Sequence, residues 1–196
     1  MIVVQRGAQI SKSVMNTQRV AIFTINMDPL CVWTDGSCLN NGMVGASCGI
    51  GIFYNIESVR NVSTRLPIGK QTNNRAELCA ILYALCTNKG SQSIVIVTDS
   101  SYSIKCITEY RYRWEANGWV TSQGKPVEWG NIIRYICLLI DSRNEKGGTT
   151  TFKHIRGHSG DFGNDRADQL AHSAALNGTM SSIVSFLNRK CGVPFS

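Results

Sequence analysis

Two acidic residues stand in matching positions after apolar segments of this sequence. Asp35 follows the segment 31–34 and Asp99 follows the segment 93–98, and at both places the order is Thr, Asp and a small residue. An acid at the end of a β-strand can act as a metal ligand or a proton carrier on a rigid base. Each acid alone has a simpler interpretation, since Asp-Gly is a common turn and Asp a common helix N-cap. The repetition favours a shared site, because acids at the ends of neighbouring strands converge on one crevice.

Four further residues could belong to such a site. Glu77 lies beside the apolar face of a predicted helix, where a solvated acid near a helix N-terminus would also be ordinary. His158 has glycines at positions 157 and 160, which favour exposure over the burial usual for a lone histidine. Asp165 and Asp168 follow at i and i+3 of a helix predicted to begin near Gly163. His154 and His172 have no comparable setting and are interpreted as structural.

The elements that must position these residues alternate between strand and helix patterns. Residues 36–45 read as a loop rich in Asn and Gly. Apolar patterns predict strands at 31–34, 46–54, 58–65, 93–98 and 149–155, and helices at 72–87, 102–109, 129–141 and from about 163. Thr72 or a following Asn is the expected N-cap of the helix at 72–87. The first three strands are joined by short links and suggest an antiparallel meander, whereas the continuous apolar run at 94–97 is typical of a buried parallel strand. The pattern predicts an α/β fold.

Composition limits the class of protein. A chain of 196 residues suits one domain with tails, and a net charge of +7 is compatible with a polyanionic partner. Eight cysteines without a CxxC pair favour small core residues in a reducing compartment over zinc ligands. No apolar run approaches the roughly 20 residues that cross a bilayer, so we expect a soluble intracellular protein without membrane contact, its compartment open between nucleus, cytoplasm and organelle.

Residues 110–119 alternate aromatic with basic and amide side chains. Such rings and cations suit a nucleic-acid surface, where rings stack on bases or sugars and cations meet phosphates. The alternative is a helix that packs Tyr110 and Trp114 on the core. The pattern favours binding for Trp114 and leaves both interpretations open for Trp119.

Four blocks of this sequence together resemble type 1 ribonuclease H: Thr34 to Ser37, Asn74 to Leu78, Thr98 to Ser100, and Gly157 to Gly160 followed by Asn164 to Ala171. The resemblance implies an α/β RNase H-like fold, a five-stranded mixed sheet with three antiparallel strands and two parallel additions, flanked by helices. The expected division is an irregular leader at 1–29, a catalytic domain at 30–176 and a tail at 177–196. The leader is too short for the hybrid-binding module of many eukaryotic members, so a stand-alone catalytic domain of low processivity is expected.

The resemblance implies endonucleolytic hydrolysis of the RNA strand of RNA–DNA hybrids, leaving 5′-phosphate and 3′-hydroxyl ends. It implies two Mg²⁺ ions, with Mn²⁺ as a possible substitute, held by Asp35, Glu77, Asp99 and Asp168. Asp35 would bridge both ions, Glu77 and Asp99 would serve the leaving group, and Asp168 would hold the ion carrying the attacking water. His158 would assist proton movement or product release. Asp168 is chosen over Asp165 because the family acid lies ten residues beyond the loop histidine. We expect a monomer.

Substrate positions also carry over from the resemblance. Those expected near the 2′-hydroxyls of the RNA strand are Cys38, Asn41, Asn73 and Asn74; those expected at a DNA phosphate are Lys70 and Thr72; and those expected in a DNA-facing groove are Tyr110, Trp114 and Ser122. Three departures weaken the expected grip on the DNA strand. Lys70 replaces an arginine of cellular eukaryotic members and loses its bidentate contact, Trp129 stands where an amide would help, and Tyr110 replaces a tryptophan.

Two alternatives keep this fold. One is a catalytically silent nucleic-acid-binding or interaction module, whose sign would be a lost carboxylate, and no carboxylate of the four is lost. The other is a related-fold DNA nuclease, such as a transposase or a Holliday-junction nuclease. The Asn74–Leu78 block and the His158 loop argue against that second alternative.

Overall fold

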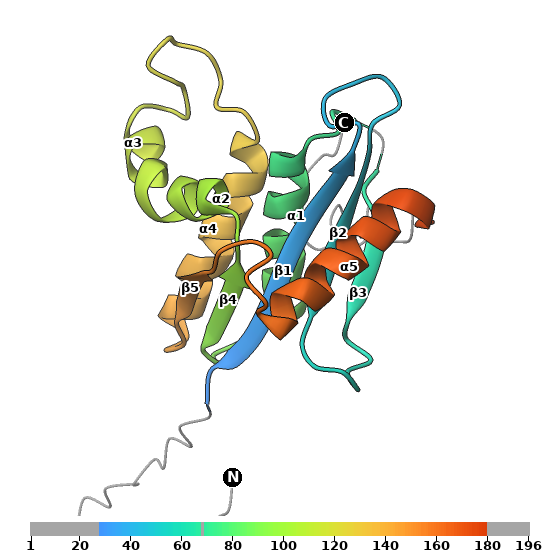
Figure 1. Cartoon of the computed structure of the whole chain (residues 1–196). Coiled ribbons are helices and arrows are strands. Elements are labelled where there is room, and N and C mark those ends of the chain that lie inside the picture. The colour runs from blue at the N-terminus through green and yellow to red at the C-terminus, as the bar shows by residue number, and fades with distance from the viewer. Residues whose placement is uncertain (1–27, 68, 180–196) are drawn as a thin grey trace, which may run out of the picture.

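The computed structural model describes residues 28–67 and 69–179, which form one mixed five-stranded sheet with helices on both faces (Figure 1). The strands are β1 (Leu30–Leu39), β2 (Ser47–Phe53), β3 (Val62–Arg65), β4 (Ile94–Thr98) and β5 (Thr150–His154), in the order β3-β2-β1-β4-β5. β1, β2 and β3 pair antiparallel, and β4 and β5 add in parallel. The predicted sheet is therefore confirmed. The predictions for the leader and the tail lie almost wholly outside the described residues.

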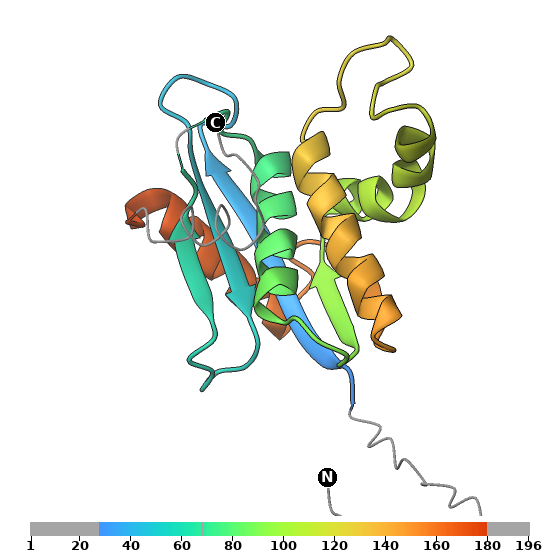
Figure 2. The ribbon, with the colours of Figure 1, turned by 180° about the vertical axis from the view of Figure 1, so that it is seen from behind.

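The helices divide between the two faces of this sheet. They are α1 (Asn73–Thr87), α2 (Ser101–Lys105), the π-helical segment η1 (Cys106–Tyr110), α3 (Arg111–Ala116), α4 (Gly130–Glu145) and α5 (Phe162–Asn177). α5 lies across β1, β2 and β3 on one face (Figure 1), and the reverse view shows α1 and α4 on the other (Figure 2). Among the described residues, no helix is both long enough and apolar enough to cross a membrane.

The core is centred on α1, which is buried on nearly every side. Its largest buried side chains are Leu78, Ile81, Leu82 and Leu85, which share one cluster with Ile50 of β2. The sequence predicted a single apolar face for this helix. Because the sheet covers one side of α1 and α4 covers another, residues such as Cys79, Ala80 and Cys86 are also buried. The helix is thus held as a rigid support, since each large buried side chain stabilises the fold by about 2 to 3 kcal/mol.

Two predicted strand boundaries were wrong. β1 continues through the stretch expected to be a loop, since Gly36 pairs with Ile50 and Leu39 with Ser47. Residues of low strand propensity join β1 there because β2 satisfies their backbone groups. β3 begins at Val62 instead of Ser58. Asp35 therefore lies in the middle of β1, but β1 pairs with β4 only as far as Trp33, so Asp35 lies just beyond that pairing.

Close packing of the helices depends on two glycines. A Cβ atom at Gly36 would overlap the backbone of Ala76 and Glu77 in α1. A Cβ atom at Gly51 would overlap the carbonyl of Ala167 in α5. Since backbone cannot move aside as a flexible side chain can, only glycine lets the two helices lie this close to the sheet. The contact at Gly36 fixes the position of Glu77. The contact at Gly51 fixes the position of Asp168, which directly follows Ala167.

Candidate active site

Three acidic side chains from three separate elements meet at one place. Asp35 comes from β1, Glu77 from α1, and Asp99 from the turn between β4 and α2. One carboxylate oxygen from each lies within 4.8 Å of the others. Asp35 and Glu77 are buried, and Asp99 is half-buried. Ser100, not Asp99, caps α2, with its hydroxyl accepting from the Ser103 N–H, which leaves the Asp99 carboxylate for the cluster.

Three ionised carboxylates together are electrostatically unfavourable in this cluster. Burial, followed by the nearby charges of Asp99 and Asp168, raises the pKa of Asp35 from 3.8 to about 7. Burial likewise raises the pKa of Glu77 well above its usual value, helped by Asp35 and Asp99. A hydrogen bond from the Gly36 backbone lowers the pKa of each carboxyl but does not cancel these effects. The site therefore stores repulsion that a bound cation would relieve.

The donor set fits a metal ion. The Glu77 Oε2 atom is buried and has no hydrogen-bond partner among the described residues. A buried carboxylate oxygen without a partner is costly, and a cation is one way to satisfy it. All the candidate ligand atoms are carboxylate oxygens, which hard divalent cations prefer. The cluster thus fits metal binding.

The fourth predicted acid, Asp168, lies on α5 and is half-buried. Its charge contributes to the raised pKa of both Asp35 and Glu77, whereas Asp165 contributes to neither. α5 begins at a different acid, Asp161, whose side chain accepts the Asn164 N–H. Asp168 thus influences the cluster electrostatically and Asp165 does not, but Asp168 is not among the three acids whose oxygens meet within 4.8 Å.

The predicted loop histidine is exposed beside the cluster. His158 has a φ of 53°, in the left-handed region that non-glycine residues adopt rarely. A Cβ atom at Gly157 would lie 2.7 Å from Asp99 Oδ2, so this glycine lets the loop pass next to the acid. His154, interpreted from sequence as structural, has its Nε2 atom 3.2 Å from the Asp99 carbonyl oxygen. Only the parallel register of β4 and β5 reveals that contact.

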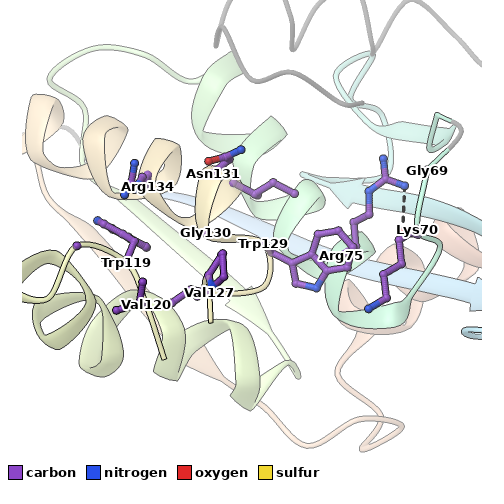
Figure 3. A pocket seen from close by; sticks show the side chains of 13 residues that line it. Gly69, Lys70, Arg75, Trp119, Val120, Val127, Trp129, Gly130, Asn131 and Arg134 are labelled. Atoms are coloured by element: carbon purple, nitrogen blue, oxygen red, sulfur yellow. Dashed lines mark hydrogen bonds between the residues drawn. The ribbon is translucent and has the colours of Figure 1, made fainter. Parts of the chain in front are cut away.

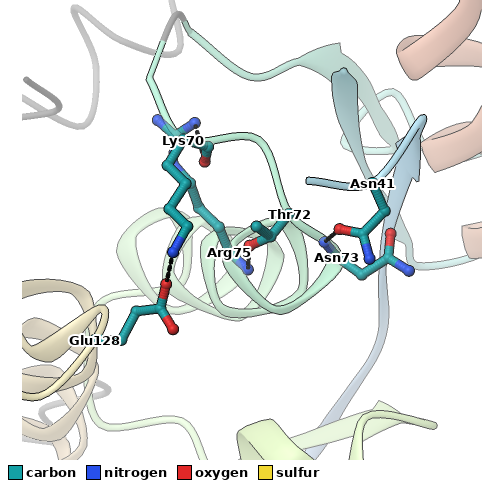
Figure 4. A network of polar contacts seen from close by, with 6 residues as sticks. All are labelled: Asn41, Lys70, Thr72, Asn73, Arg75 and Glu128. Atoms are coloured by element: carbon teal, nitrogen blue, oxygen red, sulfur yellow. Dashed lines mark hydrogen bonds and ion pairs between the residues drawn. The ribbon is translucent and has the colours of Figure 1, made fainter. Parts of the chain in front are cut away.

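Two of the residues predicted near the RNA strand, Asn41 and Asn73, meet at the start of α1 (Figure 4). The Asn41 side chain accepts the Asn73 N–H at 3.0 Å, which ties the β1–β2 loop to the helix. Thr72 caps α1, as the sequence indicated, by accepting the Arg75 N–H. Asn74 is exposed next to them, and Cys38 lies opposite Cys48 in the β1–β2 ladder.

The aromatic stretch packs partly on the core. Trp114 is half-buried, with Tyr110 at 5.6 Å and Trp119 at 6.0 Å between ring centroids. Tyr110 is 42% exposed, and Ser122 is exposed in the loop that follows. Trp114 therefore packs partly against the core, and the binding role that the sequence favoured for it stays a prediction.

A cleft opens between the loop before α1 and the loop before α4, lined by Lys70 and Trp129, two positions that the resemblance had singled out. It encloses about 460 Å³, with Lys70 and Arg75 at one end, Trp119 and Arg134 at the other, and Trp129 between them (Figure 3). Lys70 forms an ion pair with Glu128, a residue that attracted no attention in the sequence (Figure 4). The only sign of this ion pair in the sequence was an acidic residue directly before Trp129, in a chain whose net charge is positive.

Comparison with known proteins shows to which family this chain belongs. The sequence model of RNase H matches residues 27–176. The chain belongs to the RNase H family. The chain is similar to Ribonuclease H of Schizosaccharomyces pombe, at 40% identity over 76% of this chain and 53% of the relative. It is 37% identical to human Ribonuclease H1 over 78% of this chain and 52% of the relative. It is 34% identical to Ribonuclease H of Cyanothece over 74% of this chain and 87% of the relative.

The chain thus spans about half the length of the first of these relatives. Solved structures of the RNase H fold agree. A foamy viral protease-reverse transcriptase structure in complex with dsDNA is similar with a TM-score of 0.60 and 26% identity, over 76% of this chain and 98% of that chain. LC9-RNase H1, described as a type 1 RNase H with the type 2 active-site motif, is similar with a TM-score of 0.56 and 28% identity, over 77% of this chain and 74% of that chain.

Proposed function

We propose that this chain hydrolyses the RNA strand of RNA–DNA hybrids and leaves 5′-phosphate and 3′-hydroxyl ends. The observation that carries the proposal is the convergence of Asp35, Glu77 and Asp99, with Asp168 acting on the same cluster, at the acidic positions of the family. The names of the relatives, Ribonuclease H and Ribonuclease H1, support the activity. All four acids come from one chain, so a monomer suffices for the site.

The proposed cofactor is a pair of Mg²⁺ ions, with Mn²⁺ as a possible substitute. Asp35, Glu77, Asp99 and Asp168 would hold these ions, with Asp35 as the ligand shared between them, as the resemblance to the family implies. Such ions supply a more acidic water as nucleophile and compensation for the charge that develops on the leaving oxygen. The residues of the chain hold the donor oxygens in place before any ion arrives, since β1 and α1 are buried and rigid.

The remaining residues act on the substrate. His158, on its exposed loop, would accept or deliver a proton near the cleaved phosphodiester and help the product to leave. Asn41, Asn73 and Asn74 offer amide groups at the start of α1, and we propose that they and Cys38 recognise the RNA strand near its 2′-hydroxyls. Lys70, Thr72, Tyr110, Trp114 and Ser122 would face the DNA strand.

The test is a cleavage assay on three end-labelled duplexes of one sequence: an RNA–DNA hybrid, double-stranded RNA and double-stranded DNA. The hybrid is also tested with Mg²⁺ removed by EDTA. We expect cleavage of the RNA strand of the hybrid alone, and only with Mg²⁺. Asp35→Asn should retain hybrid binding and lose cleavage. Intact hybrid with cleaved DNA would favour a related-fold DNA nuclease, and binding without cleavage by the unsubstituted chain would favour a silent module.

A further inference from the structure

An apolar groove lies at the end of the sheet where β1 and α5 both begin (Figure 1). It encloses about 710 Å³, and its apolar lining includes Trp33 of β1, Phe53 of β2, Phe162 of α5 and Ile56, which follows β2. None of the described residues that line this groove belongs to the proposed site of hydrolysis. An inference about the groove therefore does not rest on the proposed function.

Three aromatic rings of the groove contact one another in turn. The ring centroids of Trp33 and Phe53 are 6.1 Å apart, and those of Phe53 and Phe162 are 5.9 Å apart. Phe53 is buried and Trp33 half-buried, whereas Phe162 is 57% and Ile56 69% exposed. Exposed apolar side chains that gather at a groove mark an interaction surface.

The groove is fixed before anything enters it. The Trp33 indole Nε1 donates to Asp161 Oδ1 at 2.8 Å, and the same oxygen accepts the Asn164 N–H at the start of α5. A Cβ atom at Gly163 would overlap the Trp33 ring, so α5 packs directly on the indole. A surface that is ordered in advance loses little entropy when a partner docks.

The residues before β1 include a segment of matching character. Residues 20–25 read Val, Ala, Ile, Phe, Thr and Ile, and only one of the six is polar. In an extended segment, alternate side chains point the same way, which puts Ala21, Phe23 and Ile25 on one side. That side is wholly apolar and carries an aromatic ring at its centre.

The charges of the groove and of this part of the chain are complementary. Among the described residues, the lining of the groove includes the acids Glu57 and Asp161 and neither lysine nor arginine. Arg166, one turn further along α5, contacts the Phe162 ring at 5.8 Å. Residues 1–27 contain three basic residues and no acidic one. Opposite charges of this kind favour the encounter of the two surfaces.

The length of the chain permits the contact. Trp33 lies three residues into β1 from Leu30, roughly 10 Å along the strand. Ile25 precedes Leu30 by five residues, which span up to about 17 Å when extended. The segment can therefore turn back beside Trp33. The residues after 179 are the other apolar candidate, but they follow the far end of α5, about 22 Å from Phe162.

We propose that residues 20–25 of this chain fold back and dock in the groove, with Phe23 between Ile56 and Phe162. Ala21 and Ile25 enter on either side of Phe23. The docked segment covers apolar surface that the described part of the chain leaves exposed. It also braces the first turn of α5, the helix that carries Asp168.

The experiment is limited trypsin digestion of the full folded chain, followed by mass spectrometry. Trypsin needs several extended residues around the bond that it cuts, so docking protects the bond after Arg19 and leaves the bond after Arg6 accessible. Ile56→Asp should speed cleavage after Arg19 about fivefold and leave cleavage after Arg6 unchanged. Val44→Asp is the matched control, since Val44 is fully exposed in the loop between β1 and β2, and it should change neither rate.

A substitution outside the groove keeps the test decisive if Ile56→Asp disturbs the fold. Phe23→Ser should speed cleavage after Arg19 as much as Ile56→Asp does, and the double variant should be cut no faster than either, because each change breaks the same contact. Thermal melting verifies that the variants fold. Equal rates after Arg19 in the unsubstituted chain and both variants overturn the proposal.

Two other results name a different occupant and also overturn the proposal. Faster cleavage after Arg189 or Lys190 in Ile56→Asp, with no change after Arg19, would assign the groove to the C-terminal segment. Protection of the Arg19 bond that increases with protein concentration would assign it to a second copy of the chain. Hybrid cleavage is scored separately, because its absence would contradict the proposed function and leave the digestion result standing.

Discussion

The acid cluster and the Lys70–Trp129 cleft are neighbouring regions built in opposite ways. Asp35 and Glu77 are buried and fixed by backbone packing, so their carboxyl groups meet before any ligand is present. Lys70 and Glu128 are exposed and pair with each other. Under the proposed function, catalysis would depend on the rigid core, whereas the grip on substrate would depend on side chains that can exchange partners. Five predictions break or sharpen this comparison.

The largest effect is expected at the fourth acid. Asp168→Asn should lower kcat for hybrid cleavage roughly a thousandfold, the size expected when several kcal/mol of transition-state stabilisation are lost. Asp165→Asn, three residues earlier on α5, should change kcat by less than about threefold, because its charge does not reach the cluster. Steady-state cleavage of one labelled hybrid checks both variants. Equal losses would show that the choice between these acids is wrong.

The next effect concerns the packing that fixes the cluster. Gly36→Ala should lower the free energy of unfolding by about 3 kcal/mol, because its Cβ overlaps the α1 backbone at Glu77. Gly42→Ala is the control, since its Cβ meets nothing within 4 Å and only its φ of 73° is unfavourable. It should cost about 1 kcal/mol. Urea denaturation measures both, and equal costs would contradict the close approach.

The third prediction uses the raised pKa of Asp35 in the metal-free protein. The folded state holds this proton up to about pH 7, whereas the unfolded chain releases it near 3.8, so stability falls as pH rises between these values. Above pH 7, Asp35→Asn should therefore be more stable than the unsubstituted chain by roughly 2 to 4 kcal/mol. Thermal melts in EDTA at about pH 5 and about pH 8 measure the difference. Mg²⁺ should raise Tm more for the unsubstituted chain, and a less stable variant at the higher pH would refute the argument.

A smaller effect is expected at the exposed side of the site. His158→Ala should lower kcat about tenfold to a hundredfold, a proton-transfer contribution at the lower end of the usual range. His172→Ala is the control and should leave kcat unchanged, since His172 is exposed near the middle of α5, four residues beyond Asp168. A pH–rate profile of both variants separates proton transfer from product release. An unchanged kcat in His158→Ala would remove this residue from the mechanism.

The smallest effect belongs to the exposed ion pair. Lys70→Ala and Glu128→Gln should each change the free energy of unfolding by less than about 1 kcal/mol, because solvent screens both charges. Chemical denaturation of the single variants and the double variant gives the coupling energy between the two residues. A coupling energy well above that value would mean that the pair stabilises the fold. The contrast between the cleft and the rigid acid cluster would then be wrong.

The sequence by itself determined the order of the helices and strands and the identity of the motif acids, because local sequence patterns specify both. Apolar periodicity located α1 and α4, Thr72 was recognisable as a helix cap, and the repeated Thr-Asp pattern paired Asp35 with Asp99. These features depend on residues close together in the chain. They therefore need no knowledge of the partners that each element meets.

The tertiary structure alone decided what depends on distant partners. Pairing with β2 extended β1 through Gly36 to Leu39, and coverage by α4 buried nearly all of α1. The approach of His154 to Asp99 and the pairing of Lys70 with Glu128 join residues 55 and 58 positions apart. Such contacts arise from the way helices and strands pack, which no local pattern specifies.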